Sequence, residues 1–108
     1  MISITKQLQE LDLSPKTYLE TAKQYARSHG YDPSLLKLAT TAPYKLAYDG
    51  IPFGRTPYAD FIIYTMSDPD QAEDRRKRYL ARASKMPGNW KDDKLSRNML
   101  AMNILWNA

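Results

Sequence analysis

The chain has no cysteine and only one histidine, His29, among its 108 residues. The lack of cysteine excludes disulfide bonds and thiolate metal sites, and is typical of an intracellular, reducing setting. With one histidine, a zinc site would depend on several carboxylates, which is unusual, so we predict no metal and no cofactor. No apolar run approaches the roughly 20 residues of a membrane span, and the start, MISITKQLQEL, lacks a signal-peptide core.

The sequence also lacks the motifs that reveal catalysis by their spacing. No G-x-G-x-x-G, G-x-x-x-x-G-K-[ST], H-E-x-x-H, EF-hand loop or G-x-S-x-G occurs. The few glycines fit turns and helix ends, and His29 fits a structural position at the end of a predicted helix. We therefore predict that the protein is not an enzyme.

What is present indicates one small, mildly basic domain. A chain of this length corresponds to a single domain, which we place at residues 1–108. The formal net charge is +4 and the isoelectric point is about 9.3. This charge permits an anionic partner without requiring one.

The N-terminal part, residues 1–43, carries helix signals. Apolar residues at helical spacing predict a short helix near residues 4–11. Ser14 can cap a second helix, and Gly30 suits the position just after its end. Leucines after Asp32-Pro33 predict one more short turn of helix there.

The middle part, residues 44–66, changes to the period of strands. The stretch YKLAYDGIPF predicts a hairpin, because Asp49-Gly50 favours a tight two-residue turn. This turn places Tyr48 opposite Ile51 and Leu46 opposite Phe53, all on one face. Pro52 lacks an N–H, so the second strand is predicted to lie at an edge. The next apolar stretch, residues 60–66, is either a third strand or a short buried helix.

The C-terminal part, residues 67–108, is predicted to hold two helices. The first runs over residues 67–86, with acidic residues in its first turns, Lys85 in its last, and Pro87-Gly88 as its stop. The second, over DDKLSRNMLAMNILW, is apolar almost all round and is therefore predicted to be buried. The fold class that follows is α+β, with N-terminal helices, a small sheet and two C-terminal helices.

A basic stripe is the main candidate for a functional surface. Arg75, Arg78, Arg82 and Lys85 step by three, four and three along the predicted helix, which places them on one side. Such a stripe can follow phosphates or an acidic protein groove. A solvated face is the alternative, because the pairs Glu73–Lys77 and Asp74–Arg78 would neutralise part of the run. A localisation signal is a third, weaker reading, because a regular helix presents it poorly.

Four further residues are predicted to be buried and structural. Arg76 falls within the apolar arc of the helix, where it needs a carboxylate or a carbonyl as partner. Asp60 is a possible partner, since it opens the apolar stretch that follows the hairpin. Trp90 and Trp106 are predicted to pack in the core. Most tyrosines also lie at core-facing positions, although tyrosines can stack on bases.

Several of these residues form a pattern that resembles a family. The sequence contains Phe53-Gly54, Tyr58-Ala59-Asp60-Phe61, Arg75-Arg76, Tyr79, Arg82, Asn89-Trp90 and Leu105-Trp106. Over about residues 44–106 this resembles a small basic family of uncharacterised proteins from large double-stranded DNA viruses and related viral metagenomes. The resemblance implies a viral origin and a virion or genome-associated role. It implies no catalytic residues.

Two functional hypotheses follow. The first is a small virion structural protein, such as a minor capsid or cement component, whose partners are other virion proteins. Its expected location is the virion, and the host cytoplasm or nucleus during infection; an oligomer is compatible with this role. The second is a nucleic-acid-binding protein that contacts phosphates through the stripe. We place the first ahead, because +4 is a low net charge and the acidic first turn of the helix dilutes the stripe.

Overall fold

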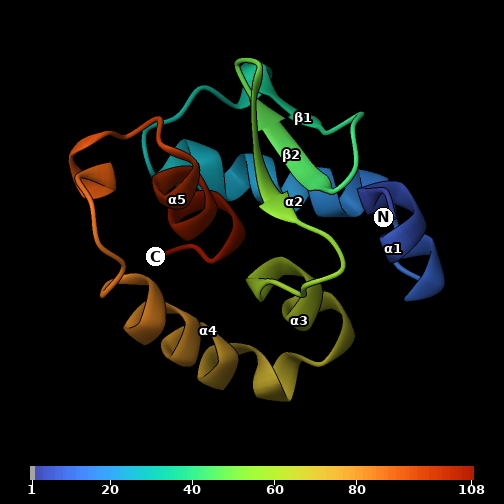
Figure 1. The fold of residues 1–108 in the computed structure, drawn as a ribbon. Coiled ribbons are helices and arrows are strands. Elements are labelled where there is room, and N and C mark those ends of the chain that lie inside the picture. Colours follow the sequence, from blue (N-terminus) through green and yellow to red (C-terminus); the bar gives the residue numbers. More distant parts are fainter. Residues whose placement is uncertain (1) are drawn as a thin grey trace.

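A small antiparallel sheet and the helices packed around it make up the fold in Figure 1, a computed structural model that describes residues 2–108. The sheet has the order β1-β2-β3 and consists of β1 (Leu36–Leu38), β2 (Tyr44–Tyr48) and β3 (Ile51–Arg55). The α-helices are α1 (Ile4–Glu10), α2 (Pro15–Ser28), α3 (Phe61–Ser67), α4 (Pro69–Ala83) and α5 (Arg97–Leu100). Three short turns complete it: the 3₁₀ turns η1 (Pro33–Leu35) and η2 (Trp90–Asp92), and the π-helical turn η3 (Ala101–Leu105). The predicted α+β class is confirmed.

The hairpin has the predicted register. Tyr48 pairs with Ile51, and Leu46 pairs with Phe53. Asp49 and Gly50 form the turn with φ values of 48° and 83°. Positive φ at both positions matches the right-handed twist of the strands. The strand β3, which carries the proline, lies at an edge of the sheet, as predicted.

The third strand of the sheet lies elsewhere than the sequence predicted. After a single turn of 3₁₀ helix, residues 36–38 form β1 and pair with residues 46–48 of β2. The prediction of a helical turn is therefore correct only up to Leu35, because pairing with β2 overrides the local signal. Residues 60–66 were left open between strand and helix, and they form α3.

Side chains just before the helices explain where several of them begin. The Ser14 hydroxyl accepts a hydrogen bond from the Thr17 amide at 3.3 Å, and Pro15 takes the first helical position of α2. The Asp60 carboxylate accepts from the Ile63 amide at 2.9 Å and starts α3. This cap decides the conformation of a stretch whose composition suits a strand equally well.

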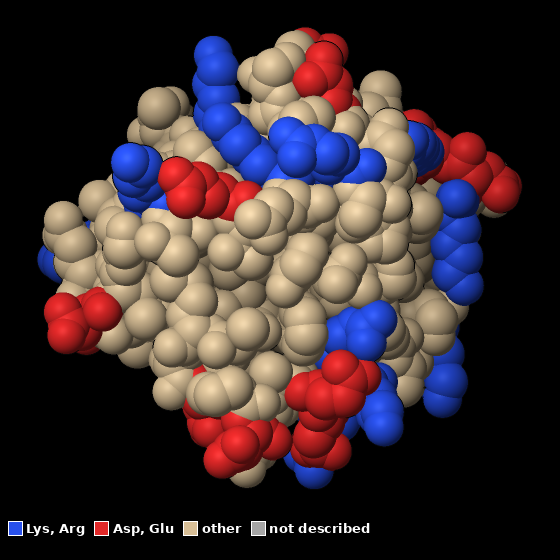
Figure 2. Space-filling view, turned by 180° about the vertical axis from the view of Figure 1, so that it is seen from behind, with Lys and Arg blue, Asp and Glu red and all other residues tan. Residues whose placement is uncertain are grey.

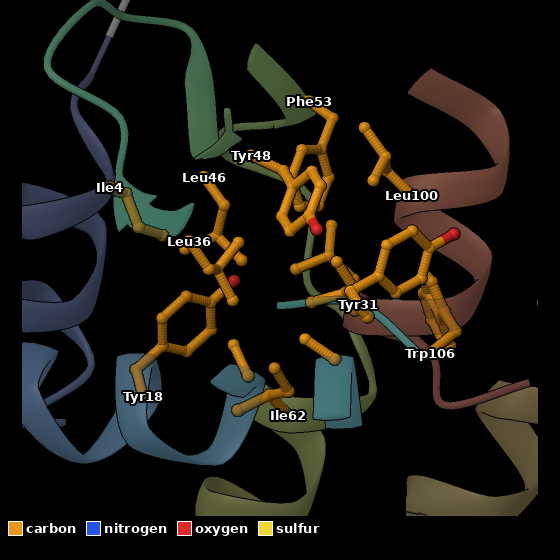
Figure 3. Close-up of a cluster of buried hydrophobic side chains, with 14 of the residues drawn as sticks. Ile4, Tyr18, Tyr31, Leu36, Leu46, Tyr48, Phe53, Ile62, Leu100 and Trp106 are labelled. Carbon is orange, nitrogen blue, oxygen red and sulfur yellow. The ribbon is translucent and has the colours of Figure 1, made fainter. Parts of the chain in front are cut away.

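The hydrophobic core joins both ends of the chain (Figure 3). It draws buried side chains from α1, α2, the sheet, α3 and the C-terminal helix: Ile4, Tyr18, Tyr31, Leu36, Leu46, Tyr48, Phe53, Ile62, Leu100 and Trp106 are labelled there. The C-terminal helix is thus buried in the protein's own core. It is shorter than predicted, since it begins at Arg97, and Leu95 before it is 44% exposed.

The basic helix is also shorter than its sequence pattern. It ends at Ala83, so Lys85 lies beyond α4 and not in its last turn. Ala72 and Ala83 are its only fully buried residues, and α4 packs mainly on α3 (Figure 1). Within residues 2–108, no helix combines the length and the apolar content that crossing a membrane requires.

Candidate anion-binding cleft

A cleft of about 530 Å³ lies between α4, the end of β3, the loop before α3 and the C-terminal helix. The residues that line it are Lys45, Gly54, Arg55, Tyr58, Ala59, Asp60, Tyr64, Arg75, Arg78, Tyr79, Arg82, Ala101, Leu105 and Trp106. Its size falls within the range of pockets that hold small molecules, roughly 300–1,000 Å³.

The cleft gathers much of the positive charge of the protein. Three arginines come from α4, namely Arg75, Arg78 and Arg82, and Arg55 comes from β3. Together with Lys45, the lining contains five cations and one carboxylate, a net charge of +4. The whole chain also carries a net charge of +4, so the formal charges of the residues outside the cleft cancel one another. The charge is therefore localised, and the local field is stronger than the total suggests.

The structure divides the predicted basic stripe. Arg75, Arg78 and Arg82 are exposed and line the cleft, whereas Lys85 is exposed outside it. Arg78 forms the predicted salt bridge with Asp74, at 3.1 Å, and both side chains are more than half exposed. Such a pair contributes little to stability and leaves the guanidinium accessible. The predicted bond of Glu73 to Lys77 is wrong, because Glu73 binds Arg76 at 2.9 Å.

Aromatic rings alternate with the arginines on the wall. Tyr79 and Trp106 stack on each other with ring centroids 4.2 Å apart and planes 6° apart. Burial raises the pKa of the Tyr79 phenol, against the opposing effect of Arg82, so this ring remains neutral near neutral pH. The Arg75 guanidinium lies 5.7 Å from the centre of the Tyr64 ring. In contrast to these rings, Tyr58 is 71% exposed.

A buried ion pair lines the deeper part of the cleft. The Lys45 ammonium donates to the Asp60 carboxylate at 2.9 Å, and the two side chains are only 2% and 1% exposed. The Tyr18 hydroxyl donates to the same carboxylate oxygen at 2.7 Å. Burial raises the pKa of Tyr18 well above its usual value, and the Asp60 charge adds to this effect, so the phenol stays a donor. The only carboxylate of the lining is thus neutralised by its neighbours.

Arg76 binds backbone carbonyls, which is one of the two kinds of partner that we predicted. The prediction that it meets Asp60 is wrong, because Lys45 occupies that carboxylate. Its guanidinium instead donates to the backbone carbonyls of Trp106 at 3.0 Å and Asn107 at 2.9 Å. With 26% of its side chain exposed, Arg76 fastens α4 to the C-terminal segment and does not line the cleft.

This contact gives a prediction for stability. Arg76→Ala is expected to lower the free energy of unfolding by about 1–3 kcal/mol, because two carbonyls lose a charged donor. Arg75→Ala is the matched control and should cost less than about 1 kcal/mol, since Arg75 is exposed. Urea unfolding of both variants measures the difference. Equal losses would contradict the fastening role.

The remaining predicted residues lie apart from the cleft. Trp90 is half-buried in η2 and donates to the Met86 carbonyl at 3.1 Å, so its predicted place in the core is wrong. His29 contacts the Asn107 side chain at 3.0 Å. Across residues 2–108, the His, Asp and Glu side chains form no group of three that could hold a metal ion.

Sequence reasoning missed three cleft residues. Lys45 belongs to β2, where the alternation pattern assigns it to the side facing water, and Arg55 ends β3 on the same face as Ile51 and Phe53, where no charged site residue was expected. Tyr58 was noted only as part of the resemblance. These three residues share no signal in the sequence, and only the folded chain brings them to one cleft.

A comparison with models of protein families, with curated proteins and with solved structures found no match. The resemblance to viral proteins therefore stays a prediction, and the function has to be argued from the cleft.

Proposed function

We propose that the protein is a non-enzymatic nucleic-acid-binding protein that contacts phosphates in the arginine-lined cleft. The observation that carries this proposal is the convergence of Arg55, Arg75, Arg78 and Arg82 on one cavity. Guanidinium groups match phosphate oxygens in pairs, and their charge releases counterions from the backbone. The fold that positions them does not depend on them, because all four side chains are exposed.

Two features of the structure favour this proposal over the virion structural role that the sequence placed first. The low net charge counted against nucleic acid, but the cleft alone carries +4. The apolar C-terminal helix suggested a protein partner, but Leu100, Ile104 and Leu105 are buried in the protein itself.

Figure 2 shows the side opposite to Figure 1, where a broad band without charged residues crosses the middle. Charge is thus unevenly distributed over the surface.

A minor capsid or cement role remains a second candidate, supported by the outer edge of β3. This strand pairs only with β2, so part of its other side is open to a partner, although Pro52 offers no N–H there and its carbonyl accepts from Arg97 at 2.9 Å. In this role the arginines would face an acidic protein surface instead of phosphates. Viral origin, location in the virion and assembly with other virion proteins belong to this candidate. Mass spectrometry of capsid and core fractions from purified particles would test it.

The salt dependence of oligonucleotide binding tests the first proposal. We expect the triple variant Arg75→Gln, Arg78→Gln, Arg82→Gln to bind a labelled oligonucleotide more weakly, as followed by fluorescence anisotropy. Three lost phosphate contacts should flatten the slope of log K against log salt by about 2.1 units on a single strand and about 2.7 on a duplex. Glutamine keeps the helix propensity of α4 close to that of arginine.

A second triple variant separates position from total charge. Lys6→Gln, Lys16→Gln and Lys37→Gln remove the same charge at exposed sites outside the cleft. The proposal requires this variant to keep nearly the parent slope. If both triple variants lose affinity equally, binding is diffuse and the cleft has no special role. If the parent binds neither single strand nor duplex, the phosphate proposal fails.

A further inference from the structure

The shape of the cleft restricts which form of nucleic acid it can take. A duplex is read by elements that project into its grooves. Here the arginines line a cavity of about 530 Å³, which a duplex is too wide to enter, so a duplex could contact only their exposed outer parts. A single nucleotide unit is of a size that such a pocket holds.

The cleft also offers one aromatic ring that is largely exposed. Tyr79 and Trp106 cover each other, and Arg75 lies over Tyr64. Tyr58 is 71% exposed and belongs to the loop before α3. It lines the same cavity as the arginines of α4. An exposed ring beside arginines is the combination on which unpaired bases stack while their phosphates are neutralised.

Cations from two elements line the cavity together with this ring. Arg55 follows Gly54 at the end of β3 and lies three residues before Tyr58 in the chain, and both side chains line the cavity. Arg78 and Arg82 line it from the opposite element, α4. Asp60 does not oppose a phosphate, because Lys45 and Tyr18 already bind its carboxylate.

We infer that the cleft binds one unpaired nucleotide, with its base stacked on Tyr58 and its phosphate held by the arginines. This inference rests on the proposed function and narrows it to single-stranded nucleic acid or free nucleotides. Both sources present the same chemistry, a planar base joined to a phosphate. Duplex is the form that the cleft should bind less well.

Variants of Tyr58 test the stacking directly. Tyr58→Ala should weaken binding of a single-stranded oligonucleotide about 5- to 150-fold, the loss expected for one stacked base. Tyr58→Phe keeps the ring and should stay within about threefold of the parent. Both variants should keep the parent salt slope, because no phosphate contact is lost. Thermal unfolding should be unchanged, since the side chain is mostly exposed.

The ligands form the second part of the experiment, run with the parent protein and with Tyr58→Ala. A single-stranded oligonucleotide, its duplex, a mononucleotide and heparin are compared at one salt concentration. We expect the single strand to bind tighter than the duplex and heparin, and only the single strand and the mononucleotide to depend on Tyr58. Measurable mononucleotide binding identifies free nucleotides as a source; its absence, with the strand still bound, identifies the strand.

The outcomes separate this inference from the proposed function. If duplex or heparin binds as tightly as the single strand, or if Tyr58→Ala binds like the parent, the inference is overturned. In that case the arginine variant can still flatten the salt slope, and phosphate binding in the cleft stands. If the arginine variant also leaves the slope unchanged, both fail.

Discussion

Asp60→Ala is expected to lower the free energy of unfolding by about 3–5 kcal/mol, because it leaves the Lys45 ammonium buried without a counterion. The same substitution removes the acceptor of the Tyr18 hydroxyl and the cap of α3. A domain of this size is stable by about 5–15 kcal/mol, so the variant should be close to unfolding. Urea unfolding followed by tyrosine and tryptophan fluorescence measures the loss.

A double variant shows whether the loss comes from the unpaired charge. Lys45→Met with Asp60→Asn replaces both charges by neutral side chains of similar size, and asparagine can still cap α3. We expect it to recover most of the stability, because neutral replacements of buried pairs are often well tolerated. If Asp60→Ala lost less than about 1 kcal/mol, the Lys45–Asp60 pair would be solvated and not buried in the deeper part of the cleft.

Gly54→Val is the second substitution with a large expected effect. Gly54 has a φ of +74°, and an added Cβ would lie 2.7 Å from the Leu105 side chain and 3.2 Å from Lys45 Cβ. Backbone strain at a β-branched residue costs about 1–3 kcal/mol, and overpacking costs about 1–3 kcal/mol more. The free energy of unfolding, measured in urea, should therefore fall by a total of about 2–6 kcal/mol.

Gly50→Val is the matched control for the backbone part of this effect. Gly50 has a similar φ of +83°, but an added Cβ there meets no atom within 4 Å. It should therefore lose only about 1–3 kcal/mol. If both glycine variants lost the same free energy, the contact of Gly54 with Leu105 would be looser than the structure has it.

The hairpin was predictable because its signal is local. Asp49-Gly50 fixes the turn, and the turn sets the register in which Tyr48 faces Ile51 and Leu46 faces Phe53. The strand at residues 36–38 was not, since it forms by pairing with residues 46–48. Residues 60–66 stayed ambiguous for the same reason: their apolar pattern suits a strand or a helix, and one hydrogen bond from the Ile63 amide to Asp60 goes with the helix.

Part of the candidate site could be predicted from the sequence. Helical spacing placed Arg75, Arg78 and Arg82 on one side of α4, and this local geometry is what the structure has. Nothing in the spacing could tell that Arg55 and Tyr58 face the same cavity, because that depends on how the chain turns after β3. Lys45 was not predicted as a cleft residue, because alternation along the strand assigns it to the solvent-facing side of the hairpin. The C-terminal helix and Asp60 cover that side instead.

The way α4 is held has a consequence for motion. Only Ala72 and Ala83 of this helix are fully buried, and its links to the C-terminal segment are the Tyr79–Trp106 stack and the Arg76 hydrogen bonds. Loss of these contacts together with the packing of α4 on α3 would free α4 while α2 stays packed in the core. We therefore expect its amide hydrogens to exchange with solvent through local opening, at a lower free energy than those of α2. Because α4 carries three of the arginines that line the cleft, a ligand bound there is expected to slow that exchange.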